Sequence, residues 1–325
     1  MLWAIIGDLD YMAAVLGLPR FSSKAAPCSL CRCTGVGPLT WTDCRLSAPW
    51  MLTCWAVGAW RAWADRSKNP VFDLPSVSAL TVGLDYTHAK YLGMDQYQFG
   101  SVLYLLVFIV MQGSPMQNLT KIWVCVKQYY KEHKTPVRHR YLNKLTMFCR
   151  KKGFPKLRGK AAEIKYFGKP LLAVWSKWMN PALVVHRRIH LMLKCNVMME
   201  DIMSEHKNDF ALPPESATKF KQTAFTMAQL QTQVAEHFLS NCLHEQGQPL
   251  FDITSKTHMV LHCALLSGSI NPRKTWCFTG EDMMQKGQIL FASCAKGDTG
   301  PDAVCKGMSH YRLALHLEFL KFADE

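Results

Sequence analysis

Two cysteines, Cys28 and Cys31, have the spacing in this sequence that most directly indicates metal chemistry. A Cys-x-x-Cys turn directs both sulfur atoms to one side, and two such thiolates form half of a four-ligand zinc site. Cys33 and Cys44 lie nearby, but the rest of the site must come from elsewhere in the chain. The alternative is that these are unpaired structural cysteines. We favour zinc, because the Pro-, Gly- and Ser-rich segment 20–50 contains little else that could order it.

Three acidic residues and one histidine could also carry chemistry, and each has a simpler explanation. Asp8 follows the apolar segment 2–6, at the end of a predicted strand, where α/β proteins place their sites, although it could equally cap a helix. Asp85 and His88 are three residues apart, so both could contact one metal ion, or Asp85 could orient the imidazole. Glu281 opens a late predicted helix, where the helix dipole alone favours an acid.

A strongly basic segment, residues 121–194, occupies the middle of the chain. It contains 19 Lys or Arg residues against two acids, a net charge of +17 in a chain whose total is +14. Aromatic residues lie among these cations, and phosphates can take the charges while bases stack on the rings. The alternative is a solvated helical face with core aromatics. The residues that we expect to contact nucleic acid are Lys121, Lys127, Arg138, Arg140, Lys144, Arg150, Lys151, Lys152, Arg158 and Lys160.

The spacing of apolar residues predicts the elements that would position these groups. Residues 2–6 and 80–84 read as short strands and residues 9–16 as a helix, which is typical of an α/β protein. A long, mainly helical block follows, and residues 255–265 form a helix that would place His258 and His262 on one face. Further helices are predicted over 51–64, 98–112, 119–132, 171–179, 182–203, 216–245, 279–290 and 311–322.

Composition limits the class of protein. The chain has 49% hydrophobic and 19% charged residues, which is typical of a globular protein. The longest apolar run, Val102–Met111, is far shorter than the roughly 20 residues needed to cross a bilayer, so we expect no membrane partner. The 13 cysteines, an odd number scattered along the chain, indicate a reducing compartment rather than a disulfide scaffold.

Taken in order, these motifs resemble those of eukaryotic cut-and-paste DNA transposases of the DDE type, in the CACTA group and its Plavaka-like relatives. The resemblance covers most of residues 1–295 and depends on the order and spacing of short motifs. Those motifs are Gly7-Asp8-Leu9-Asp10-Tyr11, Pro27-Cys28-Ser29-Leu30-Cys31, Asp85-Tyr86-Thr87-His88-Ala89-Lys90-Tyr91-Leu92-Gly93, Lys256-Thr257-His258-Met259-Val260-Leu261-His262 and Phe278-Thr279-Gly280-Glu281.

The resemblance implies roles for the candidate residues. Asp8 matches the second catalytic acid of that family and Glu281 the third, and such acids bind Mg²⁺ or Mn²⁺. Cys28, Cys31 and His88 match an accessory signature and are the expected zinc ligands, with Asp85 a further ligand or a partner of the histidine. The basic helical block matches an insertion used against DNA. The resemblance therefore implies DNA as the partner, a possible homo-oligomer on DNA, and a nuclear protein that is cytoplasmic before import.

The fold class that follows is α/β with a large all-α insertion, built on an incomplete RNase H-like sheet lacking its first strands. Only seven residues precede Asp8, whereas the family's first acid lies well upstream on the first strand. We expect a partial RNase H-like region with a zinc loop over 1–95, the basic insertion over 96–250, and helices bearing the last acid over 251–325.

The expected function is that of a transposase-derived nucleic-acid-binding protein. Metal-dependent DNA cleavage and strand transfer would need an upstream segment to supply the first acid. The alternative is a non-catalytic protein that binds zinc and DNA, derived from a decayed or domesticated element.

Overall fold

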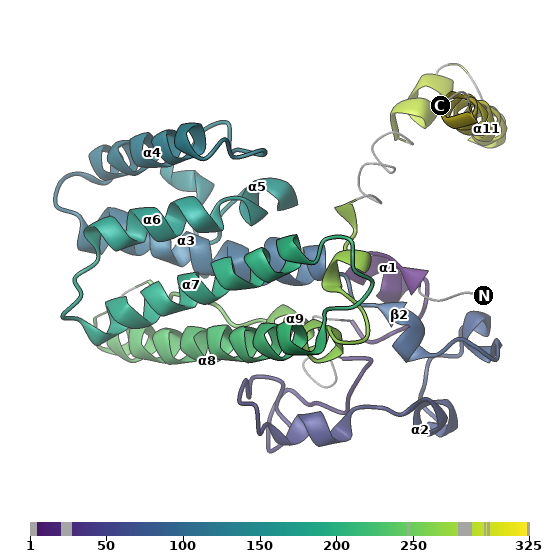
Figure 1. Ribbon diagram of the computed structural model, residues 1–325, viewed down its shortest axis with the longest axis horizontal. Coiled ribbons are helices and arrows are strands. Elements are labelled where there is room, and N and C mark those ends of the chain that lie inside the picture. The colour runs from purple at the N-terminus through teal and green to yellow at the C-terminus, as the bar shows by residue number, and fades with distance from the viewer. Residues whose placement is uncertain are drawn as a thin grey trace. The chain divides into compact units, whose positions relative to one another are not determined.

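The computed structural model describes residues 5–20, 28–245, 248–278, 288–295, 297 and 300–323, and within them the chain is mostly helical. Its contacts divide it into two compact units, Met1–Trp276 and Cys277–Glu325. The larger unit contains the long helices drawn in teal and green in Figure 1. The division of the chain into regions 1–95, 96–250 and 251–325 remains a prediction.

The body of the larger unit is a set of packed helices. Helix α7 packs along α8, α6 lies against α7, and α4 lies against α6 (Figure 1). These helices are α3 (Gln96–Leu105), α4 (Pro115–Glu132), α5 (Ala161–Lys165), α6 (Gly168–Trp178), α7 (Val184–Glu205), α8 (Pro214–Glu245) and α9 (Ser255–Leu266). Phe99, Trp175 and Phe225 are completely buried among them. Burial of such large side chains supplies most of the stability of a helical core.

Local capping explains where α4 begins. The Ser114 side chain accepts a hydrogen bond from the Gln117 backbone, the Gln117 side chain accepts one in return, and Pro115 occupies the first turn. This capping box starts α4 four residues before the predicted start at residue 119. Helix α8 likewise begins at Pro214, directly after Pro213.

The prediction of an RNase H-like sheet is wrong. Among the described residues the named strands are β1 (Ile5–Ile6) and β2 (Val82–Gly83), which pair in parallel as a two-stranded sheet. Both short strands lie where the apolar runs predicted them, and α1 (Leu9–Ala14) follows the first. A strand–helix pattern in the sequence predicts that strands form, but it does not predict how many other strands pair with them in a sheet.

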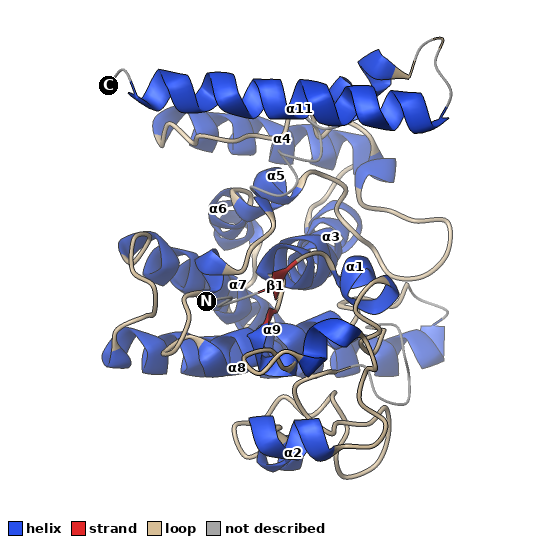
Figure 2. Cartoon of the chain, turned by 90° about the vertical axis from the view of Figure 1, so that its right-hand side faces the viewer, coloured by secondary structure: helices blue, strands red, loops and turns tan. Residues whose placement is uncertain are grey.

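Residues 28–81, which carry α2 and precede β2, are largely irregular (Figure 2). The single helix predicted over 51–64 forms instead as a 3₁₀ turn, η1 (Pro49–Thr53), and the short helix α2 (Val57–Ala62). Two further 3₁₀ turns follow, η2 (Pro70–Asp73) and η3 (Ala79–Thr81). Trp50 and Trp60 are completely or almost completely buried, so this segment is anchored by large aromatic side chains rather than by regular structure.

The segment Asp85–Val110 carries two π-helical stretches around α3, η4 (Thr87–Asp95) and η5 (Leu106–Val110). In the smaller unit, α11 (Gly300–Ala323) has Gly307 under the ring of Phe291, where an added Cβ would lie within 2.3 Å of a ring carbon. In the described part of the chain, no helix combines the length and the apolar character needed to span a membrane.

Candidate metal centre and basic surface

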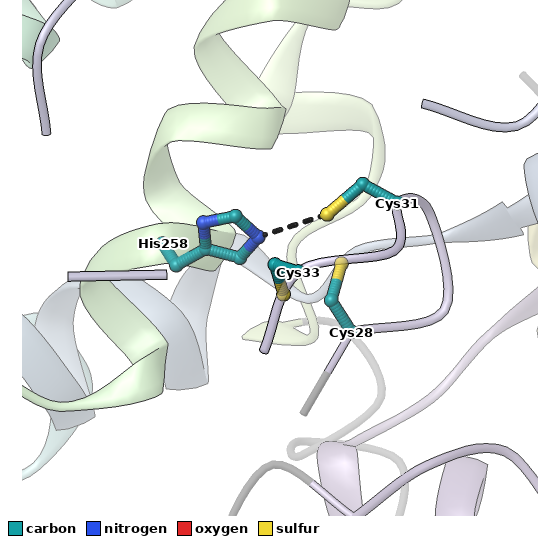
Figure 3. Close-up of side chains that lie close together, drawn as sticks. All are labelled: Cys28, Cys31, Cys33 and His258. Atoms are coloured by element: carbon teal, nitrogen blue, oxygen red, sulfur yellow. Dashed lines mark hydrogen bonds between the residues drawn. The ribbon is translucent and has the colours of Figure 1, made fainter. Parts of the chain in front are cut away.

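Four buried side chains converge at one point of the larger unit. Cys28, Cys31 and Cys33 lie on one short stretch of the irregular segment, and His258 reaches them from α9 (Figure 3). Their ligand atoms all lie within 4.8 Å of one another. A Cys₃His set of this kind could hold a structural metal ion such as zinc, which prefers four sulfur and nitrogen ligands in a closed site.

A second histidine lies against this group. The Nε2 atom of His258 is 3.3 Å from the sulfur of Cys31, and the Nε2 atom of His262 is also 3.3 Å from that sulfur. The two Nε2 atoms are 3.1 Å apart. Ligand atoms of a tetrahedral zinc ion are separated by roughly 3.4 to 3.8 Å, given bonds of about 2.1 and 2.3 Å. The observed separations are a few tenths of an ångström shorter than this, so these side chains would move slightly apart to hold a metal ion.

Trp50 and the loop backbone hold these side chains in place. The Trp50 ring packs edge-on against His258 at 4.3 Å and lies 5.1 Å from His262, while its Nε1 donates a hydrogen bond to the Asp43 carbonyl at 2.7 Å. The Leu30 backbone donates to the sulfur of Cys28 at 3.3 Å. The Nδ1 atom of His258 is buried with no hydrogen-bond partner in the described structure, so aromatic packing orients the ring.

The electrostatics of the cluster favour one thiolate. Burial raises the pKa of the Cys28 thiol, but hydrogen bonds from Cys31 and Cys33 lower it, and the net pKa lies well below its ordinary value. The same hydrogen bonds to Cys28, together with burial, raise the pKa of Cys31 and of Cys33. Burial lowers the pKa of His258, which keeps the imidazole in its neutral, metal-binding form. Metal binding would therefore release the protons of the remaining thiols.

The cluster includes two of the three expected zinc ligands. Cys28 and Cys31 belong to it, whereas His88 does not: its Nδ1 pairs instead with the carboxylate of Asp85. Asp85 is fully buried and also accepts a hydrogen bond from the Thr87 backbone at 2.9 Å. The pair thus matches the alternative in which the acid orients the imidazole.

Two ligands in the observed group were not chosen from the sequence. Cys33 was noted only as a neighbour of the Cys-x-x-Cys turn, and His258 only as one of two histidines on a shared helical face. The Lys-x-His-x-x-x-His spacing of residues 256–262 was the signal that could have identified His258. Because Cys33 and His258 are 225 positions apart in the sequence, only the tertiary structure shows that they meet.

Only one of the two predicted magnesium ligands, Asp8, lies within the described residues. Asp8 is exposed and caps α1, accepting a hydrogen bond from the Tyr11 backbone at 2.6 Å. Helix capping is the alternative role that the sequence indicates for Asp8. Glu281 lies outside the described residues.

The basic residues form an exposed surface around α4 and the segment 133–160 that follows it. All ten predicted contact residues are exposed, and none of them forms an ion pair with any other described residue. Tyr141 is 54% exposed among them, and the Lys127 ammonium lies 5.9 Å from the Trp123 ring centroid. We refer to these ten residues as the basic surface; they are Lys121, Lys127, Arg138, Arg140, Lys144, Arg150, Lys151, Lys152, Arg158 and Lys160.

Apolar side chains anchor the segment that carries most of this basic surface. Leu142, Phe148 and Leu157 are completely buried, and the Leu157 backbone donates a hydrogen bond to the Gln96 carbonyl at 2.8 Å. The segment crosses α3 at Gly100, where an added Cβ would lie 2.7 Å from the Lys156 nitrogen and 2.8 Å from that of Leu157. The cations are therefore presented on a fixed backbone.

Comparison of the chain with known protein families, with curated proteins and with solved structures found no match.

Proposed function

We propose that this chain is a nucleic-acid-binding protein whose irregular N-terminal segment is held to its helical body by a structural zinc ion. The observation that carries the proposal is the buried group of Cys28, Cys31, Cys33 and His258. Zinc at this point would join segments that are more than two hundred residues apart, and closing such a long loop restricts the unfolded chain strongly.

The exposed cations of the basic surface support nucleic acid as the partner. Cations that are already paired with carboxylates would lose those partners on binding a polyanion, whereas these ten have no ion-pair partner among the described residues. Phosphates bound by such side chains release condensed counterions, which drives association. Exposed Tyr141 adds a ring on which a base can stack.

We further propose that the chain derives from a transposase of the CACTA group or its Plavaka-like relatives. The support is the order of the Gly-Asp, Cys-x-x-Cys, Asp-x-x-His and His-x-x-x-His motifs along the sequence. DNA is the partner that this ancestry favours, and the nucleus is the compartment.

Two measurements on the purified chain test the proposed function. Elemental analysis should find one zinc ion per chain, and Cys31→Ser should lose it while Cys54→Ser, at an exposed cysteine outside the group, keeps it. Fluorescence anisotropy with a short labelled duplex should show binding at low salt that weakens as salt rises.

A matched pair of double variants locates the binding surface. Lys151→Ala/Lys152→Ala should lower the affinity for duplex DNA by about tenfold, by removing phosphate contacts. Lys207→Ala/Lys219→Ala removes two exposed lysines elsewhere on the same unit and should leave the affinity nearly unchanged. A chain without zinc, or equal losses in the two double variants, would contradict the proposal.

A further inference from the structure

A cavity of about 300 Å³ opens within the larger unit, close to the basic surface. Its walls are formed by the C-terminal end of α4 and the turn that follows, by the junction of α5 and α6, and by the C-terminal half of α7. Tyr129 and Tyr166 contribute aromatic rings to its wall, and the Tyr129 ring is stacked on His133 with centroids 3.9 Å apart. The volume is at the lower end of the range for small-ligand sites.

An ionic network lies behind Glu200 and Asn196, which line the cavity. The Lys90 ammonium, fully buried, lies 2.7 Å from Asp95 and 3.0 Å from Glu200. Asn196 donates a hydrogen bond to Asp95 at 2.7 Å, and Tyr91 donates one to Glu200 at 3.0 Å. A second lysine, Lys165, lies on the wall and interacts electrostatically with Glu200. An ion that entered the cavity would meet two carboxylates and two lysines, which compensate one another. The free energy that the ion loses with its hydration would therefore not be offset.

The polar atoms that line the cavity suit a neutral, planar ligand. The Oε1 atom of Glu200 is buried against Lys90, so Glu200 offers its Oε2 atom, which accepts from Tyr91 and can accept further hydrogen bonds. Lys165 offers an ammonium, which donates them. The Lys165 ammonium is held near the rings of Tyr166 and Trp276, at 5.2 and 4.5 Å from their centroids. A ring edge that presents two adjacent N–H donors beside one carbonyl oxygen would satisfy both groups. Among the bases, the Watson–Crick edge of guanine has this pattern.

The rim of the cavity provides a place for phosphate. The first turn of α6, Gly168 and Lys169, lies at the rim, and its N-cap residue Phe167 makes no side-chain hydrogen bond to that turn. Backbone N–H groups at a helix start attract anions. The Lys169 ammonium, half exposed, is 2.5 Å from Asp201 and could exchange this partner for a phosphate.

We propose that this cavity binds one unpaired guanine of a nucleic-acid strand whose backbone lies on the basic surface. The base enters between the tyrosine rings, its Watson–Crick edge contacts Glu200 and Lys165, and its phosphate lies at the start of α6. The inference rests on the proposed function, because the strand is held by the basic surface. It adds a preference for strands from which a guanine can be extruded, where unstacking is least costly.

The test compares short duplexes by fluorescence anisotropy: one fully paired, one with a single bulged guanine and one with a single bulged thymine. The wild-type chain should bind the guanine bulge about tenfold more tightly than the paired duplex, because the bulged base is already unpaired. A bulged inosine, which lacks the 2-amino donor, should bind more weakly than guanine. A bulged 7-deazaguanine, whose Watson–Crick edge is intact, should bind as guanine does.

Two variants at the mouth of the cavity provide the matched control. Ser204→Trp places a large side chain over the opening from an exposed position of α7, and Glu205→Trp places the same side chain at the next exposed position, which does not line the cavity. Ser204→Trp should abolish the guanine preference and keep binding of the paired duplex. Glu205→Trp should keep both.

The outcomes separate the two proposals. Equal binding of all the duplexes, or a guanine preference that survives Ser204→Trp, would overturn the guanine pocket and leave the nucleic-acid function standing. No binding of any duplex at low salt would overturn both.

Discussion

At the scale of single residues, the metal centre offers five candidate ligands for four positions. Cys28, Cys31, Cys33 and His258 lie within one sphere, and His262 lies against two of them. A closed zinc site needs four ligands, so one of the five side chains contacts the ligands without binding the metal ion itself. The geometry favours the three cysteines and His258.

We expect Cys33→Ser to weaken zinc binding by more than about a hundredfold, because even residues that only contact a ligand contribute ten- to hundredfold. His262→Ala removes a neighbour of the ligands rather than a ligand, so it should weaken zinc binding by about ten- to hundredfold. Competition with a chromophoric chelator measures both affinities. If the His262 variant lost more affinity than the Cys33 variant, the ligand set would be Cys28, Cys31, His258 and His262.

The buried acid Asp95 predicts a pH dependence. Burial raises its pKa to about 6 from an ordinary value of 3.8, although Lys90 opposes the shift. A carboxyl whose pKa is raised by folding binds its proton more tightly in the native state, so its contribution to stability is present below pH ~4 and is lost as the pH rises through ~6.

Asp95→Asn should remove this contribution. The wild-type free energy of unfolding minus that of the variant should fall as the pH rises from ~4 to ~6 and then level off. Urea unfolding of both proteins across that window measures the difference, in which the titrations of groups that do not interact with Asp95 cancel. A difference that grew with pH would mean that Lys90 lowers the pKa of Asp95 more than burial raises it.

At the scale of elements, the crossing of the basic segment over α3 links stability to binding. Gly100→Ala would place a methyl group 2.7 to 2.8 Å from backbone atoms of Lys156 and Leu157, which cannot move as a flexible side chain could. We expect a loss of about 1–3 kcal/mol in the free energy of unfolding, which is typical of overpacking. We also expect weaker DNA binding, because the segment bearing Arg150 to Lys160 is displaced.

Gly58→Ala in α2 is the matched control for this substitution. Nothing lies within 4 Å of the added methyl group there, and alanine is the better helix former by about 0.5–1 kcal/mol. It should therefore leave stability unchanged or raise it, and leave DNA binding as it is. A Gly100 variant as stable as the wild type would show that the segment does not pack tightly on α3.

Zinc should act on a second element, the irregular segment from Cys28 to Thr53. Its regular hydrogen bonds are few, so removal of the metal should release it from α9 while the helices α3 to α8 stay folded. Limited proteolysis after chelation should cut first within this segment, and zinc should restore the protection. Cuts that begin in α7 or α8 would show that the metal supports the whole core instead.

At the scale of the whole molecule, the net charge of +14 is concentrated in the segment 121–194. The logarithm of the DNA affinity should therefore fall linearly with the logarithm of salt concentration, with a slope of about −0.9 for each phosphate contacted. Each double substitution on the basic surface should make this slope shallower by up to ~2. A slope that stays the same after Arg150→Ala/Arg158→Ala would exclude those residues from the interface.

The sequence by itself determined the local features of this protein. Most of the helices follow from apolar periodicity, and the exposed cations follow from their number among few acids. The pairing of Cys28 with Cys31 and of Asp85 with His88 was also readable, because these residues are two or three positions from their partners. Such features depend on neighbours in the chain, whose geometry a spacing can predict.

Only the tertiary structure decided what those elements make together. The two predicted strands form, but they pair with each other rather than extending into an RNase H-like sheet. The imidazoles that face the cysteines are those of His258 and His262 and not that of His88. The cavity beside Glu200 joins residues from four helices. Contacts between distant segments depend on how whole faces pack, and many arrangements bury the same apolar residues equally well, so a spacing along the chain does not select one.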